Sequence, residues 1–353
     1  MLASALSPIE RLETAVLRGC AALPAPAQRI LGGPRAVRIE GQTLDPETQL
    51  LLRLLKLSRR PSDDALSVAA AREERRRQAA AVSGTPRPVA SAADRKIPGP
   101  RGDFGARLYV PLGGQTPGPL LVYLHGGGWV VGDLETHDVI CRFLAREAAV
   151  RVLAVDYRRA PEHPFPAAVD DAIAAGRFAI EEAPRLGADP DRIAVGGDSA
   201  GGNLATAAAR VLALDGGPTP AFQLLIYPVT DLSHKRRSYE RFRDGFFLTE
   251  AGMDWYRDHY LPTPDSALDP RASPLLADEL AGLPPAHVAV AGFDILRDEG
   301  EEYARRLDDA GVPVTLQRHS RLVHGFANAV GVGRAARAAM LEVAAALRAG
   351  VAA

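Results

Sequence analysis

The sequence predicts an α/β fold, with a mostly parallel sheet that carries helices on both faces. Short apolar runs recur along the chain, and segments with helical character lie between most of them. The runs are nearly continuous, as is typical of strands buried on both faces. They cover residues 120–124, 152–155, 193–195, 224–227, 288–291 and 314–317.

The composition fits a globular protein and excludes several kinds of partner. The chain has 353 residues, of which 47% are hydrophobic and 24% are charged, with a net charge of -1. Such a charge attracts neither nucleic acid nor an anionic membrane, so we expect a small-molecule partner. Residues 1–11 lack a signal-peptide pattern, and no apolar run approaches the roughly 20 residues that span a bilayer. Cys20 and Cys141 match no metal or redox spacing, and together these features predict a cytoplasmic protein.

Residues 1–92 show helical periodicity without strand alternation, and we interpret them as an N-terminal helical cap segment. Residues 50–57 are apolar on more than one face, which predicts packing against something larger. Residues 72–77 mix acidic groups with arginines, and we interpret them as a solvated helix face rather than an anion-binding patch. Residues 83–88, with Gly84 and two prolines, are typical of a linker.

The α/β core is predicted to cover residues 93–353. It begins with a hairpin of residues 94–97 and 106–110 at a sheet edge. The predicted helices that follow cover residues 137–149, 167–182, 200–214 and 299–310. About 60 residues separate the strands at 224–227 and 288–291, and a connection that long is typical of a lid or binding loop. We therefore expect residues 230–284 to be an insertion that contributes to the cap.

Ser199 lies in the pentapeptide Gly-Asp-Ser-Ala-Gly, between a predicted strand and a predicted helix. In this G-x-S-x-G pattern the glycines permit a sharp turn that exposes the serine hydroxyl. The pattern predicts an activated nucleophile, although the pentapeptide alone also fits an ordinary strand-to-helix turn.

Three glycines, Gly126, Gly127 and Gly128, follow the apolar run 120–124 directly. Backbone N–H groups left uncovered by such a loop can stabilise a developing oxyanion. The alternatives are a flexible turn and a phosphate cradle, but the loop has neither a Lys-Ser/Thr pair nor a G-x-G-x-x-G pattern. The loop is therefore interpreted as an oxyanion hole.

A serine nucleophile needs a histidine base and a carboxylate that orients it. His324 follows the last predicted strand, whereas its nearest rival, His319, falls within or at the end of that strand and is expected to face solvent. Asp294 ends the predicted strand 288–291, and its rival Asp298 fits a first-turn helix carboxylate. The order Ser199, Asp294, His324 is the order of the α/β-hydrolases. No pair of histidines has metal-ligand spacing.

Four motifs together resemble the hormone-sensitive lipase family, in its bacterial family IV esterase branch. They are His-Gly-Gly-Gly-Trp at 125–129, Asp-Tyr-Arg-Arg-Ala-Pro-Glu at 156–162, Gly-Asp-Ser-Ala-Gly-Gly-Asn at 197–203 and His-Gly-Phe at 324–326. The resemblance runs from about residue 97 to the C-terminus. It implies an α/β-hydrolase fold with an eight-stranded sheet and a helical cap.

The resemblance also implies roles for individual residues. Gly127 and Gly128 would donate their N–H groups to the oxyanion together with Ala200, the residue after the nucleophile. His125 and Tyr157 would support this loop. Trp129 stands where the family often has Phe, and we expect it to shape the substrate pocket.

The implied activity is hydrolysis of short- to medium-chain carboxylic esters through a serine acyl-enzyme, with no cofactor and no metal. Where the family commonly has Asp-Pro-Leu, this chain has Asp294 followed by Ile and Leu, which leaves the turn less rigid. Two alternatives stay open: an amide or lactone hydrolase with the same triad, and a non-catalytic small-molecule receptor on the same fold. A homodimer through the strand at 314–317 is also plausible.

Overall fold

An eight-stranded sheet forms the centre of the molecule. The structure is a computed structural model and describes residues 8–214, 216 and 219–352. The strands of the sheet are β3 (Ser91–Ile97), β4 (Phe104–Val110), β5 (Gly118–Leu124), β6 (Arg151–Asp156), β7 (Ala188–Asp198), β8 (Phe222–Ile226), β9 (Ala286–Phe293) and β10 (Val314–Val323). Their spatial order is β10-β9-β8-β7-β5-β6-β4-β3. The hairpin β3–β4 is antiparallel, β4 pairs antiparallel with β6, and all other neighbours are parallel. The predicted α/β fold and the edge hairpin are confirmed.

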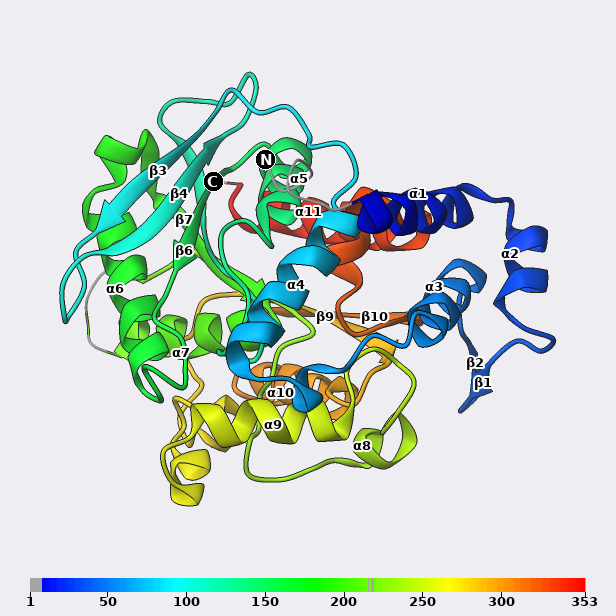
Figure 1. Cartoon of the computed structure of the whole chain (residues 1–353). Coiled ribbons are helices and arrows are strands. Elements are labelled where there is room, and N and C mark those ends of the chain that lie inside the picture. The colour runs from blue at the N-terminus through cyan, green and yellow to red at the C-terminus, as the bar shows by residue number, and fades with distance from the viewer. Residues whose placement is uncertain (1–7, 215, 217–218, 353) are drawn as a thin grey trace.

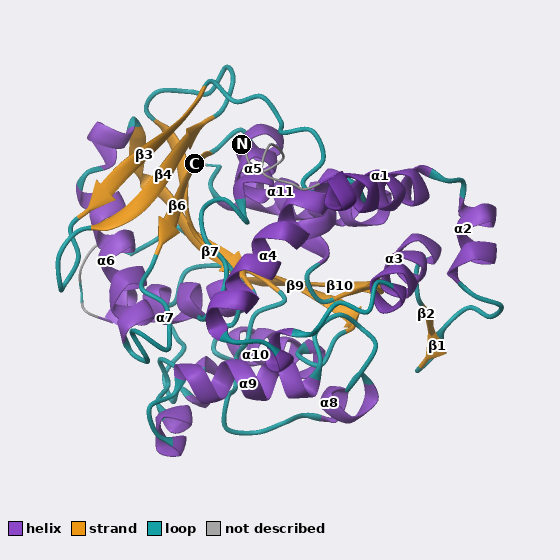
Figure 2. Ribbon diagram, viewed as in Figure 1, coloured by secondary structure: helices purple, strands orange, loops and turns teal. Residues whose placement is uncertain are grey.

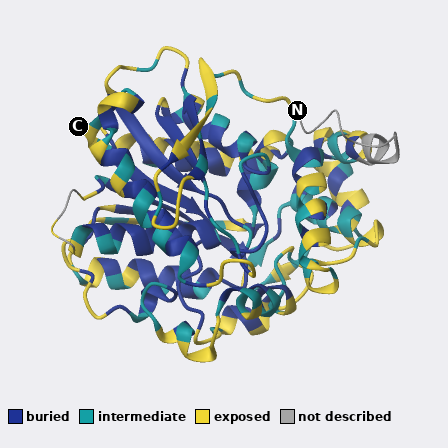
Figure 3. Ribbon diagram, turned by 60° about the vertical axis from the view of Figure 1, so that its left-hand side comes forward, coloured by how far each residue is buried: buried dark blue, intermediate teal, exposed yellow. Residues whose placement is uncertain are grey.

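Helices cover both faces of this sheet (Figure 2). On one face lie α5 (Asp138–Ala148) and α11 (Arg334–Gly350), and on the other lie α6 (Ala167–Glu181), α7 (Ala200–Leu214) and α10 (Arg297–Asp309). Side chains of β5 alternate between the two hydrophobic clusters, so that Leu120 and Val122 join one while Leu121 and Tyr123 join the other. Burial of the strands on both faces is visible in Figure 3 and explains why their sequences are continuously apolar.

The N-terminal segment is helical, as expected, but it also contains a short antiparallel pair that was not expected. Its elements are α1 (Pro8–Ala22), α2 (Ala25–Gly32), β1 (Arg38–Ile39), β2 (Gln42–Thr43), α3 (Pro46–Leu57), the short helix η2 (Asp63–Ala65) and α4 (Val68–Val82). Helix α1 packs on α3 and α4, and α4 crosses in front of the sheet (Figure 1).

The arginines of α4 correct the interpretation of residues 72–77 as a solvated face. Arg72 donates to the carbonyl oxygens of Val130 (2.9 Å) and Ala160 (2.9 Å). Arg76 bonds Asp133 at 2.6 Å. Arg72 runs inward because its partners lie on the core loops, and Arg76 reaches Asp133 from an exposed position. Helix α4 is therefore attached to the segment that follows the glycine loop.

The insertion contains α8 (Arg237–Arg241), α9 (Glu250–Tyr260) and the short helices η4 (Pro264–Leu268) and η5 (Pro274–Leu276). Helix α9 packs against η2, so the insertion and the N-terminal segment meet. Two further short helices, η3 (Ala183–Leu186) and η6 (Phe326–Gly331), follow α6 and β10 in the chain.

The sequence also led to expectations about a signal peptide, membrane-spanning helices and the two cysteines. The expectation that there is no signal peptide rests largely on residues 1–7, which lie outside the described residues. Of the helices that the structure describes, none combines the length and the apolar character needed to cross a membrane. Cys20 and Cys141 are both unpaired.

Candidate active site

Ser199 lies on a sharp turn between β7 and α7. Its φ of 57° falls in the left-handed region, which is strained for a residue with a side chain. The turn packs so tightly on the end of β5 that a Cβ on Gly201 would collide with the carbonyl oxygen of Leu124. The Ser199 N–H donates to the carbonyl of Ile226 at 2.9 Å. The glycines of the pentapeptide therefore meet a requirement for close approach, and Ser199 lies on a strained strand-to-helix turn.

The structure brings Ser199, His324 and Asp294 into one hydrogen-bonded row. Oγ of Ser199 lies 2.9 Å from Nε2 of His324, and Nδ1 of His324 lies 2.8 Å from Oδ2 of Asp294. His324 is 6% exposed and Asp294 is 1% exposed, so both contacts lie in a medium where electrostatic interactions are strong. This geometry suits proton transfer from the serine hydroxyl to the imidazole.

Asp294 is also fixed by its own turn. Its Oδ1 accepts the N–H of Leu296 at 3.0 Å, and this bond holds the carboxylate in place. The turn keeps this bond although Ile295 stands where the family pattern has a proline. The rival Asp298 points elsewhere, because it accepts the N–H of Ser238 at 2.9 Å and pairs with Arg297. Asp294 is therefore the carboxylate that orients His324 in this geometry.

Two backbone N–H groups of the glycine loop, those of Gly127 and Gly128, differ from that of Gly126. Gly127 and Gly128 have φ of 116° and 57°, and a Cβ on Gly128 would collide with the ring of Tyr256. Within the described part of the chain, neither of their N–H groups donates a hydrogen bond. The N–H of Gly126 is used differently, because it donates to Oδ1 of Asp198 at 2.9 Å. Gly127 and Gly128 thus remain as candidate oxyanion donors beside Ala200, the first residue of α7, whose N–H has no partner within the helix.

Asp198, which precedes the nucleophile, connects the elbow to the glycine loop. Besides the Gly126 N–H, it accepts the hydroxyl of Tyr123 at 2.6 Å and lies 3.4 Å from Nε2 of His137. Burial acts to raise the pKa of Asp198, but His137, Tyr123 and the Gly126 N–H outweigh burial and lower this pKa to about 2. Sequence analysis missed this role. The only signal for it was the position of an aspartate inside the G-x-S-x-G pentapeptide.

His125 and Tyr157 both contact the backbone of the glycine loop. The Tyr157 hydroxyl donates to the carbonyl of His125 at 2.7 Å, and the two rings stack with centroids 4.2 Å apart. Burial lowers the pKa of His125 to about 3, so its imidazole is neutral at pH 7. Its Nδ1 therefore carries the proton that it donates to the carbonyl of Gly126 at 2.8 Å. These contacts join both side chains to the glycine loop.

Trp129 does not line the cavity at Ser199, which corrects the expectation that it shapes the substrate pocket. Its side chain is fully buried and stacks on Tyr260, with ring centroids 4.2 Å apart and planes within 3°. The expectation that His319 faces solvent also fails, because its side chain is only 8% exposed and packs against Phe326. Trp129 is thus a core residue, whereas His319 is half-buried.

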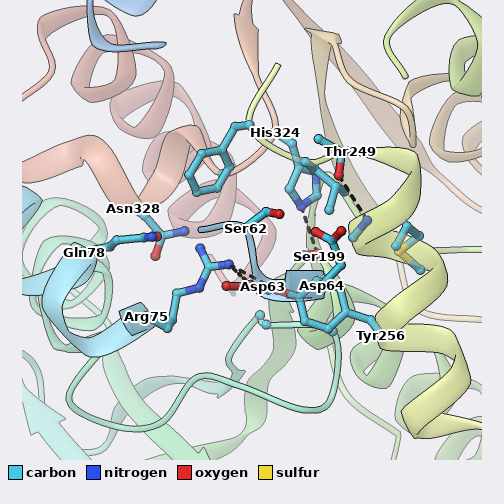
Figure 4. Close-up of a pocket in the computed structure, with 18 of the residues that line it drawn as sticks. Ser62, Asp63, Asp64, Arg75, Gln78, Ser199, Thr249, Tyr256, His324 and Asn328 are labelled. Carbon is cyan, nitrogen blue, oxygen red and sulfur yellow. Dashed lines mark hydrogen bonds and ion pairs between the residues drawn. The ribbon is translucent and has the colours of Figure 1, made fainter. Parts of the chain in front are cut away.

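A cavity of about 650 Å³ opens over Ser199 and His324. Its walls come from the glycine loop, from the N-terminal segment, including Asp63 and Arg75, and from the insertion, including Tyr256. Figure 4 shows Arg75, Asp63 and Tyr256 together beside Ser199. Arg75 pairs with Asp63 at 2.6 Å and donates to the Tyr256 hydroxyl at 3.1 Å, and that hydroxyl also bonds Asp63. Sequence analysis missed this cluster, because its members are far apart in the chain.

Metal chemistry has no candidate site in the described residues. No group of three or more His, Cys, Asp or Glu side chains there is arranged so that it could hold a metal ion.

Known proteins resemble this chain in sequence and in fold. A family described as having the alpha/beta hydrolase fold matches residues 121–328. The chain belongs to this family. It falls in the hormone-sensitive-lipase-like, family IV esterase group.

Individual relatives cover most of the chain. The carboxylic ester hydrolase LipN of Mycobacterium tuberculosis is 48% identical over 336 residues, which are 93% of this chain and 88% of LipN. An ethyl acetate hydrolase of Pseudomonas putida is 45% identical over 62% of this chain and 70% of its own length. Among solved structures, an ester hydrolase from the metagenome of Lake Arreo aligns with a TM-score of 0.84. It is 43% identical and covers 87% of this chain and 98% of its own.

Proposed function

We propose that this α/β-hydrolase cleaves carboxylic esters through a covalent acyl-enzyme on Ser199. The observation that carries the proposal is the position of His324, which contacts Ser199 Oγ through one ring nitrogen and Asp294 through the other. A serine hydroxyl is a weak nucleophile at neutral pH, and a base held at this distance activates it. The names of the relatives, which are ester hydrolases and esterases, agree with this reaction.

The reaction follows from the geometry. His324 takes the proton of Ser199 at Nε2 while the serine oxygen attacks the ester carbonyl, and Asp294 stabilises the resulting imidazolium. The N–H groups of Gly127, Gly128 and Ala200 would stabilise the tetrahedral oxyanion. His324 then returns the proton to the leaving alcohol oxygen, the C–O bond of the ester breaks, and an acyl-enzyme remains. Water, deprotonated by His324, attacks the acyl carbon, the bond between that carbon and Ser199 Oγ breaks, and His324 returns the proton to Oγ as the acid leaves.

The remaining parts of the proposal concern the substrate and the cap. We expect short- to medium-chain acyl esters and no cofactor, and we assign residues 1–92 and 230–284 to a cap over a core of residues 93–353. The cavity supports this division, because both segments contribute to its walls. A cytoplasmic location fits two unpaired cysteines. A homodimer through β10, which pairs only with β9 and ends the sheet, stays a prediction.

Ser199→Ala tests the proposal directly. The variant should stay folded, with an unchanged circular dichroism spectrum, and should lose at least about 10³-fold in kcat on p-nitrophenyl butyrate. Activity near that of the wild type would contradict the proposal. A substrate panel of amides and lactones separates the enzymatic alternative, and a protein that binds esters without turning them over would be the receptor.

A further inference from the structure

A second cavity, of about 490 Å³, lies beneath the N-terminal helices. Its walls include Leu17 of α1, Leu51 and Leu54 of α3, Val82 of α4 and Ala336 of α11. The four leucines Leu51, Leu52, Leu54 and Leu55 line it while remaining half-buried, whereas Leu50 is fully packed. This accounts for the run at residues 50–57 being apolar on more than one face. We call this space the apolar chamber.

The charged groups at the wall of the apolar chamber are engaged with protein partners. Glu47 is 4% exposed and accepts the backbone N–H of Arg334 at 2.8 Å. Arg60 and Arg77 pair with Glu74 at 2.8 and 3.4 Å. A ligand in the chamber would therefore meet hydrocarbon surface and charged groups that are already ion-paired, which favours an apolar group over a charged one.

The apolar chamber shares a wall with the cavity over Ser199. Arg75, Gln78, Phe247 and Asn328 line both spaces. Figure 4 shows Arg75, Gln78 and Asn328 grouped on one side of the cavity, across from Ser199. Phe247 lies against Gly325 and carries the Arg75 guanidinium 5.5 Å from its ring centroid. The shared lining also includes Leu52, Leu55, Arg60, His324 and the backbone of Gly325. Where the wall consists of side chains, as at Phe247, Gln78 and Asn328, rotamer changes that need no backbone motion can open it.

The position of the wall decides which half of an ester faces the apolar chamber. His324 and Gly325 line both spaces and Phe326 lines the chamber alone, whereas Ser199, Gly127 and Gly128 line only the first cavity. The acyl carbon is bonded to Ser199 in the intermediate, while the leaving oxygen must lie within reach of Nε2 of His324 to take its proton. The chamber is thus on the alcohol side of the reaction.

We propose that the apolar chamber binds the hydrocarbon portion of the substrate alcohol, so that the enzyme prefers esters of long or bulky apolar alcohols. This rests on the proposed ester hydrolysis and adds a substrate class to it. The volume is sufficient, since a cavity of about 150 Å³ holds a benzene molecule. Each methylene moved from water into such a space is worth up to about fourfold in kcat/KM.

The test is a series of acetate esters with a constant acyl group, measured by pH-stat below their solubility limits. From ethyl to hexyl acetate, kcat/KM should rise at least tenfold, against a limit of about 200-fold for four methylenes. Leu51→Trp fills the chamber and should abolish most of this rise, mainly through KM, while ethyl acetate hydrolysis stays within twofold. Leu31→Trp, on the exposed side of α2, is the matched control and should retain the full rise.

An inhibition experiment on the wild type does not depend on a variant that folds. Hexanol should inhibit ethyl acetate hydrolysis competitively, at a concentration at least tenfold lower than ethanol does. A flat alcohol series, a rise that Leu51→Trp leaves intact, or equal inhibition by the two alcohols would overturn the proposal while ethyl acetate is still hydrolysed. Absence of hydrolysis of every ester would instead overturn the proposed function.

Discussion

Asp198→Asn should weaken both the fold and the reaction, because this carboxylate holds the glycine loop to the nucleophile turn. At pH 7 the wild-type carboxylate is ionised, and its pKa of about 2 lies below the ordinary 3.8. At about 1.4 kcal/mol per pKa unit, that difference contributes about 2 kcal/mol to the free energy of unfolding. Asparagine keeps the shape but removes the charge that strengthens the bonds from Gly126 and Tyr123.

The stability assay is urea unfolding of wild type and variant at pH 7. The variant should lose about 2 kcal/mol. A group with a lowered pKa stabilises the fold above its unfolded pKa, so the difference should shrink as pH falls from about 4 toward 2. Asp191→Asn, at an exposed position on the same strand, is the control and should change stability by less than about 0.5 kcal/mol.

The kinetic assay separates positioning from general destabilisation. If the loop shifts, kcat should fall at least tenfold, toward the 10²- to 10³-fold typical of one lost oxyanion donor, while KM changes little. A folded Asp198→Asn variant with kcat within twofold of wild type would refute the reasoning that Asp198 positions the loop.

Two further predictions concern stability. His287, 2% exposed on β9, has a pKa that burial lowers to about 4, so protonation favours the unfolded chain and stability is lost as pH falls from 6.5 toward 4. Between pH 7.5 and 5 this effect lowers the free energy of unfolding of the wild type, measured in urea, by about 2 kcal/mol. The His287→Leu variant should lose about 2 kcal/mol less than the wild type over the same pH range. Equal losses in the two proteins would contradict the lowered pKa of His287. Arg72→Met removes bonds to the carbonyls of Val130 and Ala160 and should lower stability by about 2–4 kcal/mol and kcat severalfold. Arg185→Met, which removes an exposed ion pair, should cost less than about 1 kcal/mol, and a similar small loss in both would show that Arg72 does not hold α4.

The sequence was sufficient to predict the sheet and the residues that meet at its edge. Parallel strands buried on both faces are continuously apolar, so each was visible, and the carboxyl ends of such strands bring Ser199, Asp294 and His324 together. The glycines at 126–128 were also informative in the sequence, because a positive φ or a close approach of neighbouring atoms excludes a side chain at these positions.

What the sequence did not show depends on partners far apart in the chain. Trp129 follows the glycine loop, but its direction is set by stacking on Tyr260 of the insertion. The arginines of α4 form a charged run that resembles a solvent face, and only the fold brings Asp63 and Asp133 to them. The apolar chamber likewise exists only because α1, α3 and α4 enclose space together, and no local pattern predicts an enclosed volume.

The central claim is that Ser199 is a nucleophile activated by His324, and covalent labelling tests it most directly. Incubation with a fluorophosphonate, followed by mass spectrometry of the intact protein and of its peptides, should show one adduct per chain, located on Ser199. The His324→Ala variant should label at least about 10²-fold more slowly, and Ser199→Ala should not label. An unlabelled wild type would contradict the account and favour a receptor, and an adduct on another residue would place the nucleophile elsewhere.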